Sequence, residues 1–238
     1  MDTTRFARVI PASNTATHSV FILGCGGIGS FTADIVARMG FREITLCDFD
    51  SIETPNVATQ HYDLTDVGLR KVTTTGARIA AINPHINING IYRRVDIEHP
   101  LTDVPPHTII IAATDNIESR RALHHHWLNG LGDNPSLFID PRMGLEEFEL
   151  YTNQRTRHDP PSASYAAFLN DTAQTFTPLP CGAQAIAYTG SFAAAIIGSV
   201  IRRYVTGEPV PSNIHADLHR FEITSNYRKV SHAQAQTG

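Results

Sequence analysis

The sequence predicts an α/β fold, a doubly wound and mostly parallel sheet with helices on both faces. Short apolar runs typical of buried strands alternate along the chain with segments of helical periodicity. A glycine-rich turn follows the first of these runs, and acidic residues end two of the others. Because connections between parallel strands are right-handed crossovers, the intervening helices are expected to cover both faces.

Seven runs are short and apolar enough to be strands. The run at 18–23 precedes the glycine-rich turn, the run at 43–47 stops at an acidic residue, and the run at 108–113 is the most apolar of all. Continuous apolar runs of this length are typical of strands buried on both faces of a sheet. The predicted strands are 18–23, 43–47, 86–95, 108–113, 137–140, 148–151 and 215–226.

Four segments read as helices. The first stops at Gly40 and the second at Asn83-Pro84, and glycine and proline commonly mark helix ends. The last is rich in Gly and Ala, which permits close packing against a neighbouring element. The predicted helices are 30–39, 68–82, 116–128 and 183–204.

Composition excludes several classes of protein. The 238 residues are 42% apolar and 18% charged with a net charge of −4, which excludes a disordered chain, a collagen or a mucin and gives no reason to expect binding to nucleic acid or anionic membranes. No apolar run reaches the roughly 18 residues of a membrane span. The three cysteines include no C-x-x-C pair, so neither a disulfide framework nor a four-cysteine zinc site is expected. We expect a soluble protein of the cytoplasm.

The glycine-rich turn carries the main functional signal. Gly24, Gly26, Gly27 and Gly29 match the pattern G-x-G-x-x-G after a predicted strand and before a predicted helix, where backbone N–H groups and the helix end attract a phosphate. Asp48 follows 19 residues later at the end of the second strand, where a carboxylate accepts hydrogen bonds from ribose hydroxyls. This arrangement is Rossmann-like and predicts an adenine nucleotide.

Three further features favour phosphate chemistry over hydride transfer. A second acid, Asp50, follows Asp48 closely, and a polar loop follows where a dehydrogenase usually enters its next helix. Lys71 lies after the Gly68 turn, from which an ammonium can reach back to phosphates. Asp115 ends the most apolar strand and offers a hard oxygen ligand for Mg²⁺.

At this point the sequence resembles a known family, the E1-like superfamily of ThiF, MoeB and HesA proteins and the adenylation domains of ubiquitin-activating enzymes. The resemblance runs from about residue 18 to 128 in five ordered motifs. These motifs are Val20–Ser30, Ile44–Asn56, the DVGLRK segment ending at Lys71, Ile82–Ile86 and Thr114–Arg120.

The resemblance implies a nucleotidyltransferase that uses ATP and Mg²⁺ to adenylate the C-terminal carboxylate of a small ubiquitin-like protein or peptide, working as a homodimer. It implies that the glycine turn, Asn56 and Lys71 contact phosphates, that Asp48 binds the ribose and that Asp115 holds Mg²⁺. Asp50 and Gln60 complete the expected nucleotide-binding set. The division of the single ThiF-type domain is then a nucleotide-binding core (1–150), a crossover loop (151–182), a C-terminal helix and strand (183–228) and a disordered tail (229–238).

The sequence also departs from the family. Threonine stands at position 59, where the family usually has a phosphate-binding arginine, so another cation must substitute or activity is weakened. Arg70 is one candidate, and Arg5 or Arg8 from a partner chain is another. The zinc-binding C-x-x-C pairs of many members are absent, so no zinc is expected.

Cys181 follows the polar loop at the start of the last predicted helix. A helix N-terminus lowers the pKa of a thiol. Some members of the family that the sequence resembles pass the activated carboxylate to a cysteine in this region, so the resemblance makes Cys181 a candidate catalytic cysteine, as a thioester or persulfide site. The alternative is a small residue packed at a helix start. Cys25 and Cys47 are expected to be structural.

Other polar residues carry weaker expectations. His124, His125 and His126 point about 100° apart on a helix, so they cannot share one metal ion and are expected on the surface or at a dimer contact. Arg120 and Arg121 could reach phosphates, but such a pair is more typical of a solvated helix face. Arg142, after Asp140 at a strand end, is a hypothetical ligand for the acceptor's carboxylate.

Two other functions compete with adenylation. A non-catalytic E1-like partner subunit is suggested by Thr59, and a nicotinamide-dependent oxidoreductase is suggested by the glycine turn alone. Neither the acceptor nor its pathway, whether sulfur transfer, conjugation or peptide modification, follows from the sequence.

Overall fold

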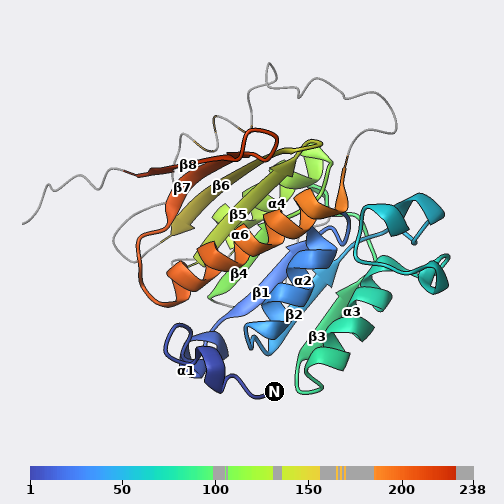
Figure 1. The fold of residues 1–238 in the computed structure, drawn as a ribbon, viewed down its shortest axis with the longest axis horizontal. Helices are drawn as coiled ribbons and strands as arrows, with labels where there is room; N and C mark the ends of the chain where they lie inside the picture. The colour runs from blue at the N-terminus through green and yellow to red at the C-terminus, as the bar shows by residue number, and fades with distance from the viewer. Residues whose placement is uncertain are drawn as a thin grey trace, which may run out of the picture.

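A single mixed sheet organises the chain (Figure 1). The computed structural model describes residues 1–98, 105, 107–130, 136–155, 165, 167, 169 and 185–228. The strand order is β3-β2-β1-β4-β5-β6-β7-β8, parallel from β3 to β5 and antiparallel from β5 to β8. The strands are β1 (Ser19–Leu23), β2 (Glu43–Cys47), β3 (Asn87–Ile91), β4 (Thr108–Ala112), β5 (Ser136–Met143), β6 (Glu147–Arg155), β7 (Pro211–Asp217) and β8 (Glu222–Tyr227).

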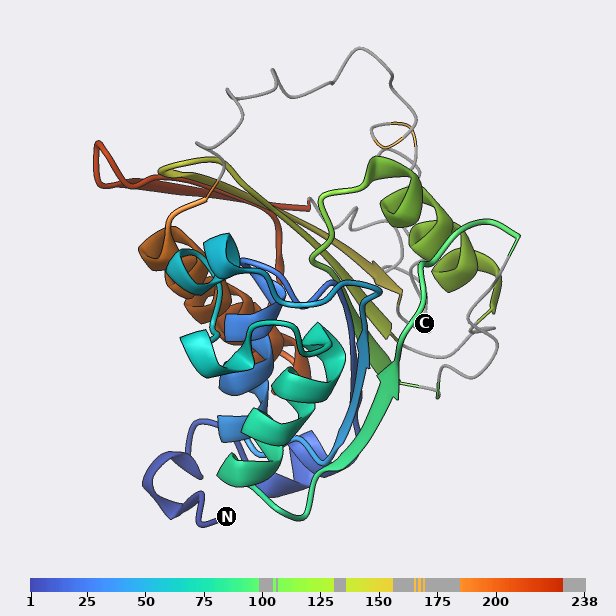
Figure 2. The ribbon, with the colours of Figure 1, turned by 90° about the vertical axis from the view of Figure 1, so that its right-hand side faces the viewer.

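Helices cover both faces of the sheet, as Figures 1 and 2 show. Helices α2, α3 and α6 lie on one face and α4 lies on the other. The α-helices are α1 (Ala12–Ala16), α2 (Gly29–Arg38), α3 (Lys71–Ile82), α4 (Ile117–Gly130) and α6 (Ala187–Val205). Three short 3₁₀ helices are η1 (Thr4–Phe6), η2 (Thr54–Ala58) and η3 (Leu64–Asp66).

The core has two parts, one on each side of the sheet. Along β1, Val20 and Ile22 belong to the cluster under α2 and α6, whereas Phe21 and Leu23 belong to the cluster under α4. Successive residues of a strand point to opposite faces, so a strand covered on both faces must be apolar throughout. This explains the continuous apolar runs, and the predicted α/β fold with a mostly parallel sheet is confirmed.

Several predicted boundaries are wrong for identifiable reasons. Helix α3 begins at Lys71 and not at 68, because Gly68 has a φ of +89° and Arg70 is extended. The predicted strand 86–95 ends at Ile91. The predicted crossover loop 151–182 begins too early, because residues up to Arg155 pair with β5.

The predicted final strand 215–226 is in fact a hairpin. Strand β7 ends at Asp217, whose Oδ1 accepts a hydrogen bond from the Arg220 amide at 3.0 Å, and β8 then returns along β7. Phe221 sits in this turn with a φ of 57°. The turn lacks the glycine that is typical of a tight hairpin, so the sequence pattern of 215–226 predicts a single strand. The C-terminal part is therefore a helix and two strands.

The three consecutive histidines occupy different environments. His124 is 4% exposed and packs against Trp127, Phe138 and Tyr165, with its Nε2 3.2 Å from the Asn153 amide nitrogen. His125 is exposed. The expected surface position is thus wrong for His124, which belongs to the core beneath α4.

None of the helices that the structure describes combines the length and apolar composition needed to cross a membrane.

We predict that His124 makes the protein less stable in acid. Burial, with a smaller contribution from His125, lowers the pKa of His124 to about 4. The unfolded chain, with an ordinary histidine pKa near 6.5, therefore binds the extra proton first as the pH falls. About 3 kcal/mol of the free energy of unfolding should be lost between pH 6.5 and 4.

Urea denaturation of His124→Gln across this pH range should show a flatter dependence than the wild type. His125→Gln, which removes the exposed neighbour, is the matched control and should keep most of the wild-type slope, because burial is the larger cause of the lowered His124 pKa. Equal slopes for the two variants would contradict the assignment.

Candidate functional site

The glycine turn between β1 and α2 lies at the carboxyl edge of the parallel strands. Gly24 has a φ of +90°, and a Cβ there would lie 2.5 Å from the Ala113 carbonyl oxygen. A Cβ on Gly29 would overlap the Gly24 carbonyl oxygen. At Gly26, by contrast, the nearest atom to such a Cβ would be the Gln60 amide nitrogen at 4.0 Å. Packing therefore requires glycine at 24 and 29 but leaves space beside Gly26.

Helix α6 closes the turn from the other side. A Cβ on Gly190 would overlap the carbonyl oxygen of Gly27, so the helix approaches the turn as closely as backbone allows. Met143, at the end of β5, lies against the same glycine. A Cβ added to Gly27 would be 3.1 Å from the Cε atom of Met143. The C-terminal half of the chain thus helps to form this site.

Asp48 fixes the turn to the end of β2. Its Oδ2 accepts a hydrogen bond from the Cys25 amide at 2.6 Å, and its Oδ1 accepts one from the Asp50 amide at 2.8 Å. The side chain is buried, and burial raises its pKa against the lowering effect of these two bonds. The Tyr62 hydroxyl donates to the Cys25 carbonyl at 2.6 Å, so the turn is held from two directions.

Lys71 is a nearly buried lysine at the start of α3. The residue is 6% exposed, and its Nζ donates to Asp50 Oδ2 at 3.0 Å. The Asp50 side chain is 45% exposed. The ammonium is therefore neutralised by an acid on the solvent side, and an anion entering from solvent could replace that acid as its partner.

The loop after β2 brings Gln60 to the turn. Gln60 Oε1 is buried and, among the residues that the structure describes, has no hydrogen-bond partner. A buried polar atom without a partner is costly, so this one is suited to a ligand or water. The Asn56 side chain is engaged within its own 3₁₀ turn, where Oδ1 accepts from the Glu53 amide at 2.9 Å.

Threonine 59 lies beside the turn, its carbonyl oxygen 3.6 Å from the Cβ position of Gly27. The Arg70 guanidinium lies 3.9 Å from the centre of the Tyr92 ring. Arg5 and Arg8 lie in the N-terminal segment, which packs through Thr3 against Gly40 at the opposite edge of the sheet (Figure 1). Within one chain the N-terminal segment that carries these two arginines therefore lies away from the glycine turn.

Asp115 follows β4 beside the turn and is exposed. No hydrogen bond joins its carboxylate to another residue within the described ranges. Nor do three His, Cys, Asp or Glu side chains of those ranges gather as a metal site. A single carboxylate can still hold Mg²⁺ together with phosphate oxygens, which is how Mg²⁺ is commonly bound.

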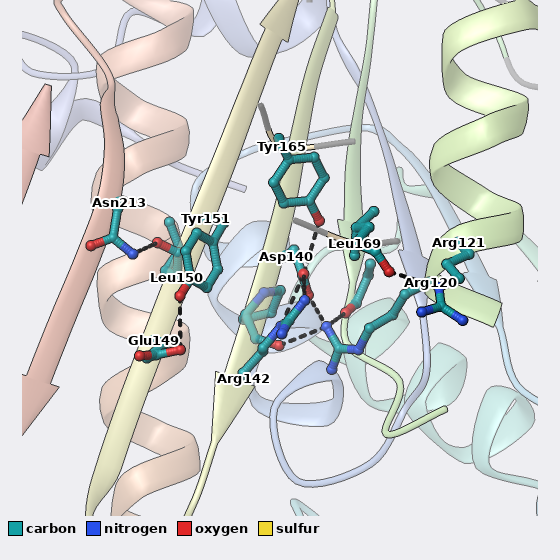
Figure 3. Close-up of polar contacts among 12 residues, drawn as sticks. Arg120, Arg121, Asp140, Arg142, Glu149, Leu150, Tyr151, Tyr165, Leu169 and Asn213 are labelled. Atoms are coloured by element: carbon teal, nitrogen blue, oxygen red, sulfur yellow. Dashed lines mark hydrogen bonds and ion pairs between the residues drawn. The ribbon is translucent and has the colours of Figure 1, made fainter. Parts of the chain in front are cut away.

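A second polar cluster lies behind β4 and β5 (Figure 3). Asp140 is fully buried and forms ion pairs with Arg120 and Arg142, and the Tyr165 hydroxyl donates to its Oδ2 at 2.8 Å. The expected solvated position is wrong for Arg120, which is 7% exposed. Arg142 is also buried, and its guanidinium forms an ion pair with Asp140. This differs from the expectation that Arg142 binds the carboxylate of the acceptor. The D-x-R pattern at the strand end was the only sequence signal of this cluster.

The cysteines divide into two groups. Cys181 lies outside the described residues. Cys25 and Cys47 are free and buried, and burial raises the pKa of both thiols, that of Cys47 to about 12. These two are suited to packing, as expected, and not to nucleophilic attack.

Comparison with known proteins places this geometry in context. The model of the ThiF family matches residues 12–237. The chain is 34% identical over 107 residues to the molybdopterin-synthase adenylyltransferase of Salmonella typhimurium, which is 44% of this chain and 43% of that protein. It is 31% identical over 118 residues to ubiquitin-like modifier-activating enzyme 5 of Drosophila erecta, which is 44% of this chain and 29% of that protein. The matches thus span less than half of these relatives.

Solved structures with similar folds include E. coli MccB and PaaA. E. coli MccB, in a crystal with AMPCPP and MccA, has a TM-score of 0.70 at 20% identity, with 95% of this chain and 72% of that chain covered. PaaA has a TM-score of 0.71 at 19% identity, with 95% and 84% covered. At these identities the likeness shows the fold, and it covers both halves of the chain.

We predict that Gly190→Ala destabilises the protein although alanine favours helices by about 1 kcal/mol. The new methyl group would overlap the Gly27 backbone, which no rotamer change can relieve. Gly76→Ala in α3 is the control, because its Cβ would lie 3.5 Å from the Ile88 Cγ2, an ordinary van der Waals distance. In urea denaturation Gly190→Ala should lose about 1–3 kcal/mol and Gly76→Ala should lose none. Equal stability of the two variants would contradict the close approach.

Proposed function

The chain belongs to the ThiF family, and from that premise we propose that it is an ATP-dependent adenylyltransferase. It activates the C-terminal carboxylate of a small ubiquitin-like protein or peptide as an acyl-adenylate. The observation that carries the proposal is the glycine turn, which is open at Gly26 and bordered by Lys71 and Gln60.

The residues around the turn fit ATP. The space beside Gly26 and the N-terminus of α2 suit phosphate oxygens, because backbone N–H groups and the helix dipole favour negative charge there. Gln60 Oε1 supplies a buried acceptor without a partner. Asp48 retains lone pairs for ribose hydroxyls beyond its two backbone bonds. We assign Gly24, Gly26, Gly27, Gly29, Asp48, Asp50, Asn56, Gln60 and Lys71 to the nucleotide.

Charge neutralisation is the chemical task of this site. The acceptor's carboxylate is ionised at pH 7 and attacks the α-phosphorus of ATP, so no protein base is needed. Asp115 together with the ATP phosphates would hold Mg²⁺, which would supply positive charge to offset the charge on the leaving pyrophosphate. Lys71 adds a second positive charge once phosphate replaces Asp50 as its partner. The residues of this chain therefore act by orientation and electrostatics.

The acceptor and the assembly are further parts of the proposal. MccB was crystallised with MccA and with ATP, and curated relatives are named for molybdopterin synthase and ubiquitin-like modifiers. These names support a peptide or small ubiquitin-like protein as acceptor. We propose a homodimer in the cytoplasm, with Arg5 or Arg8 of the partner chain in place of the arginine missing at Thr59, and Cys181 as acceptor of the acyl group in a second step.

A second candidate function is a non-catalytic E1-like partner subunit, favoured by Thr59 alone. A pyrophosphate-exchange assay distinguishes the partner subunit from the adenylyltransferase, because only the enzyme exchanges ³²P-pyrophosphate into ATP when an acceptor is present. The exchange assay should be run with ubiquitin-like proteins ending in Gly-Gly and with short peptides. Mg²⁺-dependent ATP binding without exchange for any acceptor would favour the partner subunit, and a fluorescence change with NADH in place of ATP would favour an oxidoreductase.

We predict that Lys71→Met weakens ATP binding in the presence of Mg²⁺ by about 10- to 100-fold, the value of a charged hydrogen bond. Asp115→Asn should lower the affinity measured with Mg²⁺ to that measured in EDTA. Isothermal titration calorimetry checks both. Glu43→Gln is the control, because Glu43 bonds to Asn87 at the opposite edge of the sheet. Wild-type affinity in Lys71→Met or in Asp115→Asn would overturn the role given to that residue.

A further inference from the structure

Asp140 is a buried carboxylate with no part in the nucleotide site proposed above. It lies on β5, where it accepts hydrogen bonds from Arg120, Arg142 and Tyr165. Its Oδ2 binds the Arg142 Nη2 at 2.8 Å and Nε at 3.1 Å (Figure 3). A buried ionised acid requires this degree of satisfaction, because desolvation would otherwise neutralise it.

Arg120 connects this carboxylate to the end of β4. Besides Asp140, its Nη1 donates to the Ala112 carbonyl at 2.8 Å and to the Pro141 carbonyl at 3.0 Å. The guanidinium therefore joins the last residue of β4 to β5. Burial and the nearby Arg142 lower the pKa of Arg120 to about 10, so the guanidinium remains charged at neutral pH, where it pairs with Asp140.

The turn after Ala112 contains Asp115. At its start, Ala113 lies against Gly24, whose Cβ position is 2.5 Å from the Ala113 carbonyl oxygen. At its end, Asn116 Oδ1 accepts from the Glu118 and Ser119 amides at 2.9 and 3.0 Å and so begins α4. Arg120 belongs to the first turn of that helix, so it fixes both the strand before Asp115 and the helix after it.

We propose that Asp140 is a positioning residue for the proposed magnesium ligand: through Arg120 it fixes the turn 113–116, and with that turn the place of the Asp115 carboxylate and the contact with Gly24. The readout through Mg²⁺ rests on the proposed function, whereas the fixing of the turn does not. Residues that orient a metal ligand commonly change metal affinity by 10- to 100-fold when they are replaced.

The first experiment measures the turn without any nucleotide. In Asp140→Asn, hydrogen exchange of amides in 108–120 should be at least tenfold faster than in the wild type, while amides of β2 and α6 keep their protection. Glu208→Gln is the matched control, because it breaks an ion pair with Arg202 at the far end of α6. Exchange in 108–120 that is unchanged, or that rises equally across the whole protein, would overturn the proposal.

The second experiment measures coupling to the proposed site. The Mg²⁺ concentration that half-saturates ATP binding should rise about tenfold in Asp140→Asn, whereas ATP affinity in EDTA should change less than twofold. An unchanged Mg²⁺ midpoint would overturn the link to Asp115. If the wild type itself shows no Mg²⁺-dependent ATP binding, the proposed function fails, and hydrogen exchange still decides whether Asp140 fixes the turn.

A second variant covers the case in which Asp140→Asn does not fold. Arg120→Met keeps an apolar stem but removes the Nη1 donor that bonds to Asp140 and to both carbonyls, while Arg142 and Tyr165 still hold the carboxylate. It should show the same faster exchange in 108–120 and the same higher Mg²⁺ midpoint. Wild-type values in Arg120→Met would overturn the proposal.

Discussion

The close approach of backbone segments around the glycine turn is the constraint on which the rest of the site depends. The end of β4 lies against Gly24, the turn folds onto itself at Gly29, and α6 meets the carbonyl of Gly27 through Gly190. A side chain at 24, 29 or 190 would separate elements that come from three parts of the sequence. Only the side near Gly26 has room, so the same constraint that packs the fold also determines where a ligand can enter.

Electrostatics at the site follow from this packing and not from the net charge of −4. Asp48 is held by two backbone amides, and Lys71 is buried against an exposed acid. One acid thus has a structural partner on each oxygen, whereas the other serves as a replaceable counterion. This difference separates a carboxylate that shapes the turn from one that a phosphate can displace, although both lie in the same three-residue segment.

The parallel half of the sheet could be predicted because its strands are buried on both faces and leave continuous apolar runs, as in Val20–Leu23. The glycine turn, Asp48 and Lys71 could be placed because local spacing determines where they fall relative to strand ends. His124, Asp140 and the β7–β8 hairpin could not. The environments of His124 and Asp140 depend on partners far along the chain, Asn153 and Arg120, and no local pattern encodes those pairings. The hairpin is local, but its turn contains no glycine to mark it.

The C-terminal half is therefore an integral part of the nucleotide side of the molecule. The family resemblance ends near residue 128, yet Met143 and Gly190 contact the glycine turn and Asp140 holds the β4 end through Arg120. Structures that share only about 20% of residues keep this fold over 95% of the chain. Close backbone contacts and buried ion pairs restrict geometry more than they restrict sequence, since many side chains can fill the remaining positions. The glycine turn is thus enclosed by elements from both halves of the chain, with β1, β4 and α2 on one side and Met143 and Gly190 on the other.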